Sequence, residues 1–229
     1  MAGYGNLYPD YTDDGTDSIQ NKGTFDFNYH LNSDSKIFIS YDVWARDYDS
    51  EDSSDYLSNE VWLNYQYHFN YLQFNVGGGY HKRNFDQAAV EDRDSFSWAI
   101  SLKGEKPDLD PTKRKFHFLT SLTQNYNDAG TGDSYYLATR LNMNAGYRFM
   151  EKLTSTLKGY YQNSAYDVYN GDNNTDRDDN TYKIAAVVGY DLLQNLIVSL
   201  EIGYEDRDSN ATGMSYQNTF GIISLDYNF

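Results

Sequence analysis

The residues that could perform chemistry are few and scattered. Four histidines, His30, His68, His81 and His117, fall in separate segments without the spacing of a metal site. Serine, histidine and aspartate are all present, but no G-x-S-x-G motif frames a serine nucleophile. The run VGGGY at 76–80 lacks the G-K-[ST] ending of a phosphate loop. We therefore expect no catalytic residue, no metal site, no cofactor and no enzyme activity.

The elements that position polar residues follow from a period of two. Apolar or aromatic residues alternate with polar ones in about eleven segments, which predicts β-strands with one apolar and one polar face. Aromatic residues, which favour strands, make up 17% of the chain. The segments are 24–31, 37–46, 61–69, 72–80, 96–103, 115–126, 137–149, 153–163, 182–190, 196–204 and 221–229.

Connections between these segments alternate between short and long. Short connections occur at 32–35, 70–71, 150–152 and 193–195, with a slightly longer one at 106–114. Long polar connections occupy 47–59, 84–95, 126–134, 164–180 and 205–217. This alternation is typical of an all-β, antiparallel up-and-down barrel that crosses a membrane, with short turns on the periplasmic side and long loops outside.

A soluble barrel is the alternative, and two features argue against it. Charged residues recur on the polar face, and burying them in a soluble core would cost several kcal/mol each if unpaired, whereas a wet lumen accepts them. Aromatic residues recur near strand ends on the apolar face, as in the interfacial bands of membrane barrels. The predicted lumen-lining residues are Asp26, Asp42, Trp44, Arg46, Glu60, Trp62, Lys103, Arg140, Arg148, Lys158, Lys183 and Glu201.

The last strand carries a second signal. In the ending GIISLDYNF, apolar or aromatic residues alternate at Ile223, Leu225, Tyr227 and Phe229. This ending resembles the C-terminal targeting signal of bacterial outer-membrane proteins, which stop on an aromatic residue. The resemblance implies that the barrel assembly machinery recognises this strand. It also implies that this last strand closes the barrel. We expect an outer-membrane location in a Gram-negative bacterium, with extracellular long loops and both termini periplasmic.

The number of predicted strands, about eleven, is odd. Both ends on one side require an even number of strands, so an upward strand must precede residue 18. The stretch AGYGNLYPDY at 2–11 can hold only its upper end. Either a twelve-stranded barrel has a short first strand, or the chain is part of a larger barrel, which we favour. Residues 1–17 are the N-terminal segment with this partial strand and a loop, and residues 18–229 are the barrel.

Acidic residues gather in the long connections, and the formal net charge is −16. These carboxylates could attract cations or bridge to lipopolysaccharide through divalent ions, or they could simply keep the loops hydrated, which we favour. The stretch DNNTDRDDN at 172–180 is oxygen-rich but lacks the glycine and closing glutamate of an EF-hand loop. The acidic balance excludes nucleic acid as a partner.

In its density of Tyr, Asn, Asp and Gln over residues 18–229, the chain resembles the β-barrel porin families, some of which are associated with exopolysaccharide export. The resemblance implies a channel for ions or small hydrophilic solutes, saccharides among them. A narrow or plugged barrel, serving as a structural or docking component of a larger assembly, is the alternative. Expected partners are outer-membrane lipid, lipopolysaccharide, the assembly machinery and the solutes. Whether the barrel is an open channel or a plugged one depends on whether bulky inner-face residues fill its interior. These residues are Phe38, Trp44, Trp62, Tyr136, Tyr160 and Phe220.

Overall fold

The computed structural model describes residues 2–3, 9–11, 17–48, 55–86, 92–105, 116–128, 135–166, 177–193 and 195–227. All regular structure in these residues is β-strand. Eleven long strands, β3 to β13, confirm the predicted all-β class. They are β3 (Asp17–His30), β4 (Ser35–Tyr48), β5 (Tyr56–Phe69), β6 (Leu72–Phe85), β7 (Arg93–Glu105), β8 (Phe116–Asp128), β9 (Tyr135–Arg148), β10 (Leu153–Tyr166), β11 (Arg177–Leu193), β12 (Leu196–Ser209) and β13 (Tyr216–Tyr227).

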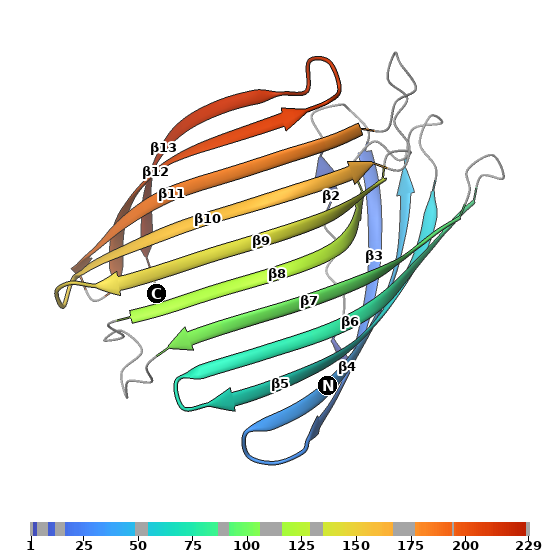
Figure 1. Ribbon diagram of the computed structural model, residues 1–229, viewed down its shortest axis with the longest axis horizontal. Helices are drawn as coiled ribbons and strands as arrows, with labels where there is room; N and C mark the ends of the chain where they lie inside the picture. Colours follow the sequence, from blue (N-terminus) through green and yellow to red (C-terminus); the bar gives the residue numbers. More distant parts are fainter. Residues whose placement is uncertain are drawn as a thin grey trace.

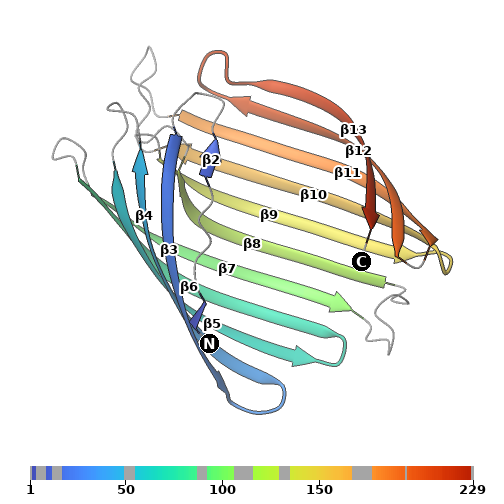
Figure 2. The same cartoon turned by 180° about the vertical axis from the view of Figure 1, so that it is seen from behind.

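The long strands form one antiparallel sheet in which each strand pairs with the next along the chain. The sheet is strongly curved, and Figure 2 shows β3 and β13 on the same side of it, in front of β7–β11. This order is the predicted up-and-down topology. No helix in the described part of the chain has the length and apolar character needed to span a membrane.

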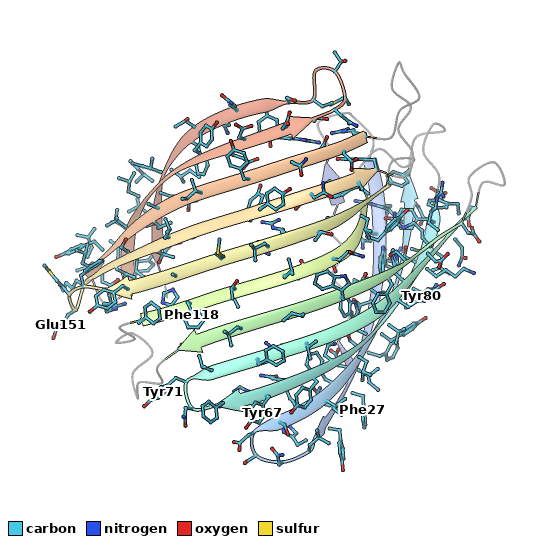
Figure 3. All side chains as sticks on the ribbon, in the orientation of Figure 1. Phe27, Tyr67, Tyr71, Tyr80, Phe118 and Glu151 are labelled. Carbon is cyan, nitrogen blue, oxygen red and sulfur yellow. The ribbon has the colours of Figure 1, made fainter. Side chains whose placement is uncertain are left out.

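The two ends of the sheet differ in their connections (Figure 1). We call the end with short connections the turn end, where Tyr71 and Glu151 lie (Figure 3), and the other the loop end. At the turn end, the Asn32 side chain accepts hydrogen bonds from the backbone of Asp34 and Ser35, both at 2.9 Å. Asn70 has a left-handed φ of 52°, which asparagine tolerates in a tight turn.

Strands reach further toward the loop end than the alternation predicted. The expected loops at 47–59 and 205–217 each contain the ends of two strands, since β4 runs to Tyr48, β5 starts at Tyr56, and β12 runs to Ser209. Polar residues stand on both faces of the ends of β4 and β12, such as Arg46 and Asp47 on β4, so the alternation there does not distinguish strand from loop. Backbone pairing nevertheless continues, because the ladder needs no apolar face once the strand lies in water.

Burial is inverted relative to a soluble protein. Among the described residues, the fully buried side chains are Asp179, Ser58 and Ser97, whereas Phe27 is 63% exposed and Leu63 58% exposed. Phe27, Tyr67 and Tyr80 extend from the outer side of the sheet (Figure 3). A continuous apolar surface of this kind is expected of a barrel that faces lipid.

Two aromatic bands flank the outer surface. The turn-end band includes Tyr29, Tyr67, Phe69, Tyr147, Phe149 and Tyr190, and the loop-end band includes Tyr41, Tyr80, Phe96, Tyr161, Tyr182 and Tyr204. On β11, Tyr182 and Tyr190 are eight residues apart, which is about 26 Å along a strand at about 3.3 Å per residue. With the strand tilted by about 40°, this separation spans about 20 Å along the barrel axis, which approaches the height of about 25 Å of the apolar band of a membrane barrel.

Tyrosines of the loop-end band donate hydrogen bonds toward the loop end. Tyr41 bonds Asn59 at 2.6 Å, and Tyr161 bonds Asn180 at 2.6 Å. Tyr80 bonds Asp94 at 3.0 Å. Asp206 accepts from Tyr182 at 2.8 Å and from Tyr204 at 2.9 Å. A row of Asn and Asp side chains therefore marks the level at which the outer surface becomes polar.

One edge of the sheet carries the short strands β1 (Ala2–Gly3) and β2 (Pro9–Tyr11). They pair with β3 at Thr24–Phe25 and at Asp17–Ile19, on the edge away from β4. β2 therefore lies beside the loop end of β3, and β1 beside its middle. Within the described residues, β13 pairs with β12 alone.

Candidate functional site

The polar face of the sheet is its concave face. Side chains from alternate strands touch there: the rings of Trp44 on β4 and His81 on β6 stack with centroids 5.2 Å apart, and His81 lies 5.7 Å from the ring of Tyr126 on β8. Alternate strands are about 9.6 Å apart, so such contacts require side chains that converge. Only the face toward which the sheet curves brings them together.

Strand register places all twelve predicted lumen-lining residues on this face. Directly opposed positions on neighbouring strands project to the same side. One row of opposed positions contains Asp42, Glu60 and His81, and another contains Asp26 and Trp62. The remaining predicted residues share the face by the same alternation; they are Trp44, Arg46, Lys103, Arg140, Arg148, Lys158, Lys183 and Glu201.

Opposite charges are paired along the concave face. Lys158 contacts Glu201 at 3.1 Å across β11, and Lys183 contacts Glu205 at 3.2 Å. Further pairs bring in Lys22, Glu105 and Asp191, which the sequence analysis did not select: Lys22–Asp42 at 2.9 Å, Lys103–Glu105 at 2.8 Å and Arg148–Asp191 at 3.0 Å. The sequence contained the charges, but only the register identifies the partners.

A hollow of about 470 Å³ lies on the concave face of β8–β12. Its lining includes the polar side chains of Arg140, Asn142, Lys158, Tyr160, Lys183 and Glu201 beside the apolar Leu119 and Met143. Arg140 stacks over the Tyr160 ring at 3.9 Å and donates to Asn142 at 2.7 Å. Aromatic faces beside amides and charges can bind hydroxylated solutes by stacking and hydrogen bonding.

A second hollow, of about 180 Å³, lies toward the loop end and shares Tyr160 with the first. At its margin, the Asp179 carboxylate, 1% exposed, accepts two hydrogen bonds from Arg177 at 3.0 and 2.7 Å and one from Arg207. Arg177 also stacks over Tyr166 at 4.2 Å. Two guanidinium groups therefore share one buried carboxylate, and we call this cluster the node. Removing one of its members would leave a buried charge unpaired, which is strongly destabilising.

This node corrects part of the predicted acidic crown. Asp179 was expected among exposed loop carboxylates, but it lies on the concave face together with Glu205, which accepts a hydrogen bond from Tyr216 at 2.5 Å. Their strands extend further than predicted, and alternation turns these two residues inward. Asp178 and Asp208, their neighbours, are exposed. Most of the oxygen-rich stretch 172–180 lies outside the described residues.

A different cluster occupies the loop end of β4–β8. Arg83, 2% exposed, donates to Ser58 at 3.0 Å and stacks over the Tyr56 ring at 4.1 Å. Arg46 and the buried His81 border it. Tyr126 reaches this cluster because β8 separates from β7 beyond Gln124 while remaining paired with β9. The separation is visible in Figure 1.

The histidines remain apart. His81 belongs to the cluster just described, and His68 contacts Gln66 at 2.7 Å near the turn end. Within the described ranges, no three His, Asp or Glu side chains converge as metal ligands. In VGGGY, Gly79 lies beneath Trp62, because a Cβ there would be 2.7 Å from the indole. This is close packing of backbone under a bulky ring, not a phosphate loop.

Three of the four predicted targeting residues lie on β13, the last strand of the described sheet. Ile223, Leu225 and Tyr227 are all exposed on the outer side of β13, with Ile223 at 76%. Phe229 lies outside the described residues. The strand therefore presents an apolar row at the sheet's edge, and its recognition by assembly machinery stays a prediction.

Comparison with known proteins identifies the family. The family model described as "Putative beta-barrel porin 2" matches residues 10–229. The chain belongs to this family. Its single antiparallel sheet with an apolar outer face is that of an outer-membrane β-barrel, as expected from the sequence. No curated protein matches the sequence.

Solved structures similar to this porin-family chain share little sequence with it. OmpT of Vibrio cholerae with loop L8 deleted aligns with a TM-score of 0.47 at 16% identity, covering 91% of this chain and 62% of that one. LpxR from Salmonella typhimurium gives 0.39 at 10% identity, covering 90% and 88%. The KdgM porin in complex with disordered oligogalacturonate gives 0.32 at 14% identity, covering 93% and 96%.

Proposed function

We propose that this barrel is a passive channel for ions and small hydrophilic solutes, including saccharides, in the outer membrane of a Gram-negative bacterium. The observation that carries the proposal is the concave face, where paired charges and tyrosines border a hollow of about 470 Å³. No residue performs a reaction in this role. The long loops face the exterior, and both chain ends face the periplasm.

The charge pairs suit a wet lumen. Lys158 and Lys183 keep 46% and 32% of their side chains exposed while bonded to carboxylates. Ion pairs of this kind contribute little to stability in water, but they set the local potential that a passing solute meets. Tyr160, Asn142 and Gln162 add neutral hydrogen-bonding groups to the same tract.

Conductance of the refolded protein in a planar bilayer tests the proposal. Stable open steps are expected, together with a measurable reversal potential in a salt gradient. Liposome swelling in neutral sugars of increasing size would then give the solute cut-off. A barrel that is folded by circular dichroism yet electrically silent would contradict the channel.

A narrow or plugged barrel that serves as a structural or docking component is the second candidate, and the stack of Trp44, His81 and Tyr126 favours it. These rings join β4, β6 and β8 across the concave face. If they obstruct the lumen, replacing Tyr126 with alanine should open or enlarge conductance. The matched control is Tyr190→Ala on the outer face, which should leave conductance unchanged.

A further inference from the structure

We propose that the larger hollow, on the concave face of β8–β12, binds an acidic saccharide through Arg140. This inference rests on the proposed channel and deepens it, because it names the class of solute that the lumen selects. Arg140 projects from the middle of β9 and lines the hollow, where its side chain is half-buried. The hollow's volume of about 470 Å³ falls within the range of small-molecule sites, about 300–1,000 Å³, so a sugar ring fits it.

The contacts of the Arg140 side chain are all with neutral groups. Its Nε donates a hydrogen bond to Asn142 at 2.7 Å, and its guanidinium stacks over the Tyr160 ring at 3.9 Å. Within the described ranges, its terminal nitrogens Nη1 and Nη2 bond no protein atom. The two faces of this group that can grip a carboxylate therefore keep their donors for a solute.

The carboxylates around the hollow are already neutralised by lysines. Glu201 is bonded to Lys158 at 3.1 Å, and Glu205, which lines the neighbouring smaller hollow, is bonded to Lys183 at 3.2 Å. Two lysines thus balance two glutamates, and Arg140 adds a positive charge that the described side chains of this hollow leave uncompensated. An anionic group of a solute would meet a net positive potential there.

The rest of the lining favours a sugar over a simple anion. Oδ1 of Asn144, a lining residue, is buried and has no hydrogen-bond partner in the part of the chain that the structure describes. This oxygen needs a donor, which a sugar hydroxyl supplies and acetate or sulfate does not. Leu119 and Ala185 add apolar contact area for the C–H groups of a sugar ring.

A sugar that carries a carboxylate matches both requirements. Its carboxylate can bind Arg140 through charge-assisted, bidentate hydrogen bonds. Its hydroxyl groups can bond Asn144 and the amide of Asn142, which also line the hollow. A neutral sugar would leave the charge of Arg140 unanswered, and a simple anion would leave the oxygen of Asn144 without a donor.

Thermal unfolding of the refolded barrel in neutral detergent measures binding without any need for conductance. At constant pH and ionic strength, glucuronate is compared with glucose, which lacks the carboxylate, and with acetate, which lacks the hydroxyl groups. A ligand that binds only the folded state raises the Tm. Glucuronate should therefore raise the Tm by several degrees at concentrations where glucose and acetate raise it much less. An equal shift with glucose would overturn the role of the charge, and an equal shift with acetate would overturn the saccharide.

Variants locate the effect. Arg140→Gln should weaken the apparent glucuronate affinity by about tenfold, as expected for loss of a charge-assisted contact, and should leave the glucose shift unchanged. Arg140→Lys should recover part of the affinity, because it keeps the charge but not the bidentate fork. The matched control is Arg148→Gln, on the same face of β9, where Arg148 is bonded to Asp191. Full glucuronate preference in Arg140→Gln, or its loss in Arg148→Gln, would contradict the site.

The site and the channel can fail separately. An electrically silent barrel that prefers glucuronate to glucose would refute only the channel. A conducting barrel without this preference would refute only the site.

Discussion

Lys158 on β10 and Glu201 on β12 meet across the strand between them, with 3.1 Å from Nζ to Oε2. Side chains two strands apart can form this pair only because the sheet curves toward them. The pair borders the larger of the two hollows on the concave face, so in the proposed channel it would face a passing solute.

Neutralising one member of this pair should change ion selectivity more than stability. Lys158→Gln leaves Glu201 uncompensated and should shift the reversal potential toward cation preference, and Glu201→Gln should shift it toward anions. Each variant should change the free energy of unfolding by no more than about 1 kcal/mol, because both side chains are partly exposed. The double variant should restore the original potential. Unchanged potentials in both single variants would show that the ions do not pass this pair.

Removing the Asp179 charge should destabilise the barrel. Asp179→Asn leaves Arg177 and Arg207 without their shared carboxylate, and breaking a buried ion pair typically costs about 3–5 kcal/mol. Equilibrium unfolding in urea with lipid vesicles would measure the loss. Asp178→Asn, on the adjacent exposed residue, should be close to neutral. Similar effects of the two substitutions would contradict a structural role for the node.

Gly79 should not tolerate a side chain. A Cβ at this position would lie 2.7 Å from Cδ2 of Trp62 and 2.9 Å from a backbone oxygen, so Gly79→Ala should cost about 1–3 kcal/mol through overpacking. The control is Gly221→Ala on β13, since no atom lies within 4 Å of a Cβ there. Heat-modifiable migration on gels gives a rapid comparison of the two. A Gly79→Ala barrel as stable as the Gly221→Ala barrel would mean that the indole moves freely aside.

A charge on the outer face should be costly at mid-height. Leu200→Arg places a guanidinium in the apolar band and should destabilise the inserted barrel by about 2–4 kcal/mol. Ser199→Arg places the same group on the concave face one residue away and should cost much less. Unfolding from vesicles measures both variants. A reversed order would invert the assignment of the two faces.

The terminal aromatic should matter for assembly. Phe229→Ser should reduce the amount of inserted protein, since the ending resembles the outer-membrane targeting signal, whereas Asn228→Ser should not. Fractionation of expressing cells and heat-modifiable migration give the readout. Normal assembly of the Phe229→Ser variant would count against targeting through the last residue.

The faces of the strands could be predicted from sequence, because alternation is local. Phe27, Leu63 and Ile223 lie outside as expected, and the predicted charges lie on the concave face. The positions at which strands end near the loop end could not be predicted, since polar residues occur on both faces there. Because the strand end was taken for a loop, Asp179 was wrongly predicted to be an exposed loop carboxylate.

The clusters depended on register and curvature. Nothing in the spacing of Trp44, His81 and Tyr126 along the chain indicates that their rings meet, because they lie on alternate strands. Nor does the sequence indicate that Arg83 and Arg93 are directly opposed, since this depends on the length of the connection between β6 and β7. Contacts of this kind need the folded sheet.

The tyrosine hydroxyls of the loop-end band also determine how the barrel meets membranes of different thickness. Tyr41, Tyr80, Tyr161, Tyr182 and Tyr204 are each tethered to an Asn or Asp side chain. Rings held in this way cannot swing to follow the headgroups, so one boundary of the apolar band stays at a fixed depth. Hydrophobic mismatch then has to be absorbed by lipid that thins or thickens around the wall, or by tilt of the whole barrel.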